Sequence, residues 1–130
     1  MLRENLDPTT TVIGLEVKVL AGLIFSEVVA DAALAADVRG LAQNNGVTET
    51  QMAEALQFAT NHEATSPSDP KVRAALILAR AASPSPAQID ADIVAACREG
   101  QLTAPAIVEL VSWISVLQML HRLSSYYVVP

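Results

Sequence analysis

Residues 102–127 read LTAPAIVELVSWISVLQMLHRLSSYY, and this stretch decides the fold of the chain. It predicts one long helix with almost no solvent face. A surface helix normally keeps a broad polar face opposite its apolar stripe. Here the polar side chains form only a thin strip with helical steps of three and four: Glu109, Ser112, Ser115, Gln118 and Arg122. We therefore expect protein to surround this helix, either from its own chain or from neighbouring copies.

Helix signals also stand at the start of this stretch and near the N-terminus of the chain. Thr103 is a suitable cap, and Pro105 fits the first helical turn. Apolar residues recur densely and with helical spacing from about residue 13 to residue 44. A break near Ala30 or Asp31 divides this overlong stretch into two helices of ordinary length.

The middle of the chain carries further start and stop signals. The sequence Asn44-Asn45-Gly46 ends the preceding helix, because Asn and Gly accept the left-handed conformation of a C-cap. Thr48 and Gln51 have the spacing of a capping box and predict a helix to about residue 61. Asp69 and Pro70 then open a helix that runs through residue 82.

A short helix over about residues 87–98, closed by Gly100, completes the set. No segment alternates apolar and polar residues as a half-buried strand does. The sequence therefore predicts an all-α fold of about six helices. We expect a single domain over residues 1–130, in which residues 1–11 form a lead-in arm.

The composition is unusually hydrophobic for a small domain. Hydrophobic residues make up 52% of the 130 residues, and the mean hydropathy is +0.35. A small domain cannot hide so much apolar surface alone, so we expect copies of the chain to share it as a homo-oligomer.

Charge and cysteine content narrow the class of protein further. The net charge is −6 and no stripe of Lys and Arg is present, which argues against nucleic-acid partners and anionic membranes. The single cysteine, Cys97, suits a reducing cytoplasm, and the polar opening segment has no secretory signal. The best transmembrane candidate, residues 12–29, fails because it contains Glu16, Lys18 and Glu27. We expect a soluble cytoplasmic protein.

The second half of the chain resembles a known family. Residues 66–123 read SPSDPKVRAALILARAASPSPAQIDADIVAACREGQLTAPAIVELVSWISVLQMLHRL. This stretch is similar to the carboxymuconolactone decarboxylase and alkylhydroperoxidase D-like family in a series of features: Asp69-Pro70, Arg73-Ala74-Ala75-Leu76, Asp90-Ala91-Asp92, Leu102-Thr103, Ile107-Val108-Glu109-Leu110 and His121-Arg122. The turn at residues 44–48 also resembles the turn after the family's active-site helix, so the likeness covers roughly residues 14–124.

The resemblance implies an all-α fold whose subunits assemble as trimers or hexamers; a dimer is also open. It also implies a place for chemistry, because peroxidase members carry Cys-x-x-Cys-x-x-x-His on the helix before that turn. The matching positions here are Asp31, Leu34 and Val38, which form no dithiol and no thiolate. We therefore expect no thiol peroxidase activity. His62 and Glu63 alone lack metal-ligand spacing, and we expect neither a metal nor a cofactor.

Four residues remain as candidates for chemistry: Glu27, Asp31, His121 and Arg122. Glu27 and Asp31 are four residues apart and share a helix face, and if that face lines a pocket, one carboxylate could be held protonated and act as acid or base. His121 and Arg122 could bind an anion or share a proton. The competing interpretation is structural: a solvated acidic edge for the first pair, and ordinary polar partners for the second.

Two hypotheses follow from these observations. In the first, the chain is a diverged, non-peroxidase member of the family that acts as an oligomeric structural protein or binds a small hydrophobic ligand. In the second, it is a cofactor-free lyase or isomerase that uses the carboxylate, histidine and arginine groups. A ligand-sized cavity that bears a carboxylate would favour the second hypothesis.

Overall fold

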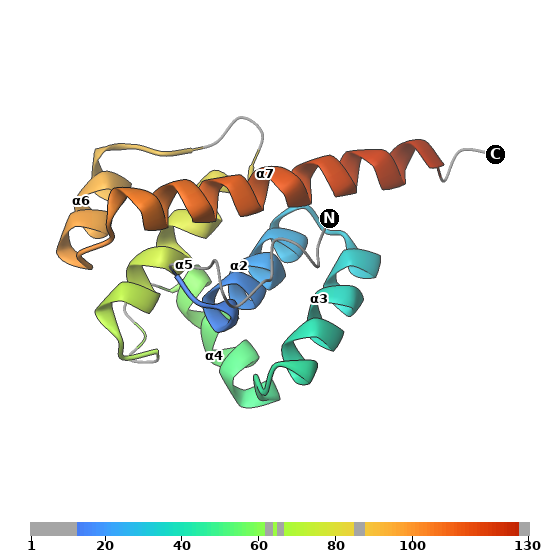
Figure 1. The fold of residues 1–130 in the computed structure, drawn as a ribbon, viewed down its shortest axis with the longest axis horizontal. Helices are drawn as coiled ribbons and strands as arrows, with labels where there is room; N and C mark the ends of the chain where they lie inside the picture. The colour runs from blue at the N-terminus through green and yellow to red at the C-terminus, as the bar shows by residue number, and fades with distance from the viewer. Residues whose placement is uncertain (1–12, 62–63, 65–66, 85–87, 128–130) are drawn as a thin grey trace.

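The computed structural model describes residues 13–61, 64, 67–84 and 88–127, with side chains up to residue 123. These residues form six helices and no strand: α2 Leu15–Val28, α3 Ala32–Asn44, α4 Glu49–Thr60, α5 Pro70–Ala82, α6 Ala91–Glu99 and α7 Ala104–Tyr127. The all-α prediction is confirmed. The expected lead-in arm, residues 1–11, lies outside the described residues, as do His62 and Glu63. In Figure 1, α7 lies along one side of the molecule and α2 lies near the centre.

The fully enclosed helix is α2, because every residue from Val17 to Ser26 is buried. It packs against α3, α4, α5 and α7. We expected the long C-terminal helix to be surrounded by protein from its own chain or from neighbouring copies, and its own chain covers only one face of it. α7 buries one face, through Ala106, Leu110, Trp113, Ile114 and Leu117.

The outer face of α7 is defined here by four exposed apolar side chains. These are Val108, Val111, Met119 and Leu123, of which Val108 is 64% exposed. Three residues of the predicted polar strip are exposed on this side as well, Ser112, Ser115 and Arg122, whereas Glu109 is not. Gln118 points inward instead and donates to the carbonyl of Ser83 at 3.2 Å.

A buried ion pair explains the inward position of Glu109. The Lys18 side chain of α2 is only 5% exposed, and its Nζ lies 3.6 Å from Glu109 Oε1. The same ammonium lies 5.3 Å from the ring centre of Trp113, whose Nε1 donates to the Lys18 carbonyl at 2.7 Å. Burial lowers the pKa of Lys18, and the carboxylate of Glu109 opposes that shift. The buried polar groups of α2 and α7 are thus paired with each other: Lys18 with Glu109, and the Lys18 carbonyl with Trp113.

The predicted helix boundaries agree with the structure to within about two residues, except that the short helix begins at Ala91, after its N-cap Asp90, and not near residue 87. Thr48 and Gln51 form both bonds of the capping box at the start of α4. Asp69 caps α5 with Pro70 in its first turn, and Thr103 Oγ1 accepts from the Ala106 amide at 3.2 Å. These ends depend on local hydrogen bonds, which explains why short stretches of sequence were sufficient to predict them.

The predicted break between α2 and α3 is also confirmed, and it is a tight turn. Ala30 adopts a left-handed conformation with φ of 56°. The amide of Ala30 donates to the Glu27 carbonyl at 3.2 Å, and that of Asp31 donates to the Ser26 carbonyl at 2.9 Å. These two bonds are those of a Schellman motif, with alanine in the position that glycine usually occupies.

Gly100 is the C-cap of α6, as predicted, but it does not adopt a left-handed conformation. Its φ is −78°, and the left-handed residue is the following one, Gln101, with φ of 58°. A Cβ on Gly100 would lie 2.3 Å from Cβ of Ala74. The glycine therefore permits the close approach of α6 to α5.

One helix of the described chain is long and apolar enough to cross a membrane by length and composition alone, and it is residues Ala104–Leu123 of α7. We expected residues 12–29 to be the best candidate and to fail as a span; α2 in that stretch has only 14 residues, and the better candidate by length and composition is α7. The inner face of α7 packs on the core through side chains such as Trp113 and Leu117.

Candidate functional site

The structure brings two of the four candidate residues into direct contact. His121 Nδ1 lies 2.8 Å from Asp31 Oδ2, although the two residues are 90 positions apart in the sequence. Asp31 is the N-cap of α3, and its Oδ1 accepts from the Leu34 amide at 3.0 Å. His121 comes from the last third of α7. The pair therefore joins the C-terminal helix to the turn between α2 and α3.

The charge on Asp31 is set by these contacts. The hydrogen bond from His121 lowers the pKa of Asp31 below its ordinary value, and the Leu34 amide acts in the same direction. Asp31 is therefore a carboxylate at neutral pH and accepts a hydrogen bond from Nδ1 of His121. In a neutral imidazole with Nδ1 protonated, the lone pair lies on Nε2. A carboxylate that orients a histidine in this way is a common element of acid–base sites.

The surroundings of the pair are partly apolar. The side chain of Asp31 is 13% exposed and that of His121 is 32% exposed. The ring of Phe25 meets the imidazole edge-on, with ring centres 6.4 Å apart. The pair is thus accessible from solvent on one side and held by α2 on another.

A recess of about 300 Å³ lies at the turn between α2 and α3. Asp31 belongs to its lining as well as to the pair with His121. The full lining is Leu23, Ser26, Glu27, Ala30, Asp31, Ala32, Ala35, Arg39 and Leu56. This volume is at the lower end of the range for small-molecule sites.

Glu27 also lines this recess, although not for the reason we predicted. We expected Glu27 and Asp31 to share one helix face. That premise is wrong, because α2 ends at Val28 and Asp31 follows the left-handed turn at Ala30. The turn instead places both carboxylates at the recess. Arg122 is exposed and is not part of the lining, so the structure does not bring it to this place.

Arg39 was not predicted as a site residue. It lines the recess, and its guanidinium lies 3.0 Å from Glu49 Oε2. Asp31, Ala35 and Arg39 are spaced by four residues, so the sequence does contain the signal that the three share one side of α3.

The three positions that we aligned with the family's redox motif lie in different surroundings. Leu34 and Val38 are buried in the core, at 7% and 1% exposure, and only Asp31 faces polar partners. Cys97 is buried on α6, and burial raises the pKa of its thiol. Among the described residues, no group of three or more His, Cys, Asp or Glu side chains could hold a metal ion.

Comparison with known proteins assigns neither a family nor a function to the chain. The chain matches no protein-family model, and no curated protein and no solved structure is significantly similar to it.

Proposed function

We propose that this chain is a non-redox, oligomeric protein on an alkylhydroperoxidase D-like scaffold, which binds a small and largely apolar molecule in the recess between α2 and α3. The observation that carries the proposal is a recess of about 300 Å³ whose wall is mostly aliphatic. The absence of a dithiol at Asp31, Leu34 and Val38 supports a non-redox role.

The lining indicates the chemistry of the ligand. Most of the wall is aliphatic and comes from Leu23, Leu56 and the three alanines at positions 30, 32 and 35. Two carboxylates at the turn accept hydrogen bonds, and Arg39 supplies donors two turns further along α3. These groups suit a compact molecule with an apolar body and one or two polar substituents.

The carboxylates of Glu27 and Asp31 in this recess, together with the contact between Asp31 and His121, favour a second function, a cofactor-free lyase or isomerase. A carboxylate of the recess takes a proton from the carbon next to a carbonyl and returns it at another carbon, so that no oxidant or cofactor is consumed. His121 holds Asp31 as a carboxylate through the 2.8 Å hydrogen bond. Proton transfer by a positioned side chain contributes about 10²- to 10⁴-fold to a rate.

Copies of the chain cover the outer face of α7 in this proposal. Val108 and Leu123 are exposed at 64% and 45% and lie at opposite ends of that face. An antiparallel pair of α7 helices places Val108 beside Leu123 of the partner subunit, and Ser112 and Ser115 near the middle allow close approach. The apolar side chains then lose their contact with water, which is the main favourable term in association.

One probe tests both functions. Cyclohexanone has an apolar body and a carbonyl, so we expect it to shift the backbone amide signals of Ala32 and Ala35 saturably in nuclear magnetic resonance spectra. Ala35→Leu fills the recess and abolishes the effect. Ala36→Leu, at the next position on α3 and outside the lining, is the matched control. Shifts that survive Ala35→Leu unchanged would reject the recess as the binding site.

The same samples in heavy water report the second function. Base catalysis replaces hydrogen by deuterium at the carbons next to the carbonyl, and we expect Glu27→Gln or Asp31→Asn to slow this exchange. Exchange at the rate of the buffer alone, with binding intact, would eliminate the enzymatic function and leave the binding function standing.

A further inference from the structure

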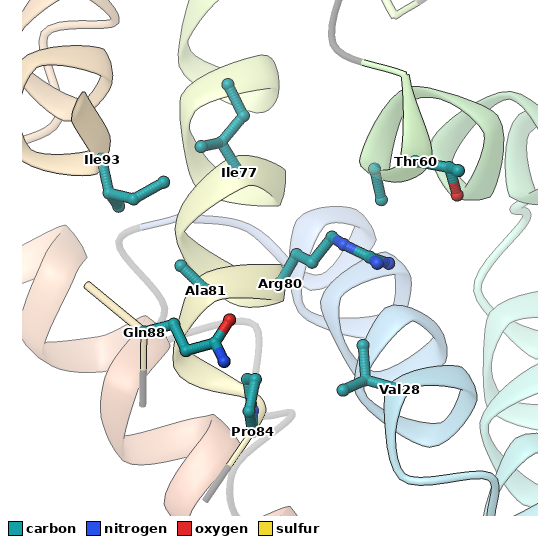
Figure 2. A pocket seen from close by; sticks show the side chains of 9 residues that line it. Val28, Thr60, Ile77, Arg80, Ala81, Pro84, Gln88 and Ile93 are labelled. Atoms are coloured by element: carbon teal, nitrogen blue, oxygen red, sulfur yellow. The ribbon is translucent and has the colours of Figure 1, made fainter. Parts of the chain in front are cut away.

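A second pocket lies on the other side of the α2 C-terminus. Its volume is about 280 Å³, and it is bordered by the end of α2, the end of α4, α5, the start of α6 and the residues Pro84 and Gln88. Its lining is Val28, Ala59, Thr60, Ile77, Arg80, Ala81, Pro84, Gln88 and Ile93. It shares no residue with the recess at Glu27 and Asp31. Figure 2 shows this pocket at close range.

Arg80 is the only charged side chain in this lining. Within the described part of the chain, its guanidinium makes no ion pair or hydrogen bond. Other arginines differ in this respect: Arg39 pairs with Glu49, and Arg73 donates to the carbonyls of Ala64 and Pro67. A cation in a pocket without a carboxylate, on a chain of net charge −6, creates a local preference for an anion.

Gln88 provides a second group of donors. Its backbone amide donates to the Ala81 carbonyl at 2.8 Å, which ties the segment after α5 to that helix. In Figure 2 the carboxamide of Gln88 and the guanidinium of Arg80 both extend toward the space beside Val28. The Thr60 hydroxyl is already used as a donor to the Leu56 carbonyl at 3.1 Å, so Arg80 and Gln88 are the side chains with hydrogens to give.

The rest of the wall is apolar. Val28, Ile77, Pro84 and Ile93 come from four different segments and surround the polar groups. A planar guanidinium donates two parallel hydrogen bonds to a carboxylate, and an aliphatic wall takes up a hydrocarbon chain. We infer that this pocket binds a small monocarboxylate with a short apolar tail, held by Arg80 and Gln88. The inference is independent of the proposed function, since the two sites share no residue.

The test uses sodium hexanoate and the full chain labelled with nitrogen-15. We expect saturable shifts at Thr60, Ala81 and Ile93. Arg80→Gln removes the charge and weakens hexanoate binding about tenfold, the amount expected for a hydrogen bond to a charged group. Arg98→Gln is the matched control, because Arg98 is also exposed and lies outside this pocket. It changes the affinity by less than about twofold.

Two further ligands distinguish the contribution of the head group to binding from the contribution of the tail. Hexan-1-ol keeps the tail without the charge, and inorganic phosphate keeps the charge without the tail, so both bind more weakly than hexanoate. The inference is overturned if either binds as tightly as hexanoate, if Arg80→Gln binds like the wild type, or if the shifts map elsewhere. Circular dichroism of each variant verifies that the helical fold is retained.

Discussion

The contact between Asp31 and His121 makes a prediction that can be worked out quantitatively. Asp31 contributes twice to the folded state: Oδ1 caps α3 through the Leu34 amide, and Oδ2 bonds His121. Loss of an N-cap costs about 1 kcal/mol. A partly exposed hydrogen bond contributes roughly another 1 kcal/mol. We therefore expect Asp31→Ala to lower the free energy of unfolding by about 2 kcal/mol.

Asp90→Ala is the matched control for the capping contribution. Asp90 caps α6 by accepting from the Ile93 amide at 3.1 Å, and it has no histidine partner among the described residues. Its loss should cost only about 1 kcal/mol. Urea denaturation followed by circular dichroism measures both variants against the wild type.

A double-mutant cycle isolates the bond itself. Asp31→Ala and His121→Ala, measured singly and together, should be coupled by about 1 kcal/mol. If the two effects add to within about 0.3 kcal/mol, the contact contributes nothing and the reasoning is refuted.

The pH dependence of this contribution has a definite sign. The pKa of Asp31 is lowered in the folded state from its ordinary value of 3.8. As the pH falls, the unfolded chain therefore binds the proton first, and the folded state loses relative stability. The contribution of the Asp31 carboxylate is complete well above pH 3.8 and is lost as the pH falls through the folded-state pKa. The difference between wild type and Asp31→Ala should shrink accordingly at acid pH.

Three further predictions concern packing and assembly. Gly100→Ala forces a Cβ to within 2.3 Å of Ala74 Cβ and should destabilise the fold by about 1–3 kcal/mol. Gly40→Ala adds a Cβ that meets no atom within 4 Å and should stabilise α3 by about 0.5–1 kcal/mol. Equal shifts of the melting temperature for the two variants would contradict the structure. Ala30→Gly relieves a left-handed alanine and should leave the unfolding free energy unchanged or raise it by up to about 1 kcal/mol, and a marked loss in urea denaturation would show that the turn is misplaced. Val108→Glu places a charge on the outer face of α7 and should reduce the mass in sedimentation equilibrium toward the 13.7 kDa of one chain, while an unchanged mass would exclude this face as the interface.

The sequence predicted the residues of the candidate site better than it predicted their arrangement in space. Asp31 and His121 could be selected from the sequence as titratable groups, but their contact requires α7 to cross the turn between α2 and α3. Glu27 was selected on the premise of a continuous helix, which the turn at Ala30 interrupts. Arg80 was not selected, because it resembles an ordinary solvated residue of α5 until the ends of α2 and α4 close a pocket around it.

The sequence by itself determined the helices and most of their ends, the start of α6 at Ala91 rather than near residue 87 being the exception. Caps such as Thr48 with Gln51, and Asp69 before Pro70, act over one turn, so they operate before any tertiary contact is made. Only the tertiary structure decided which apolar helix is enclosed. Both α2 and α7 are apolar enough for the centre, and α2 occupies it because Glu109 and Trp113 of α7 satisfy the charge and the backbone of Lys18. A buried charge is tolerated only with such partners, and residues 91 and 95 positions away along the chain provide them.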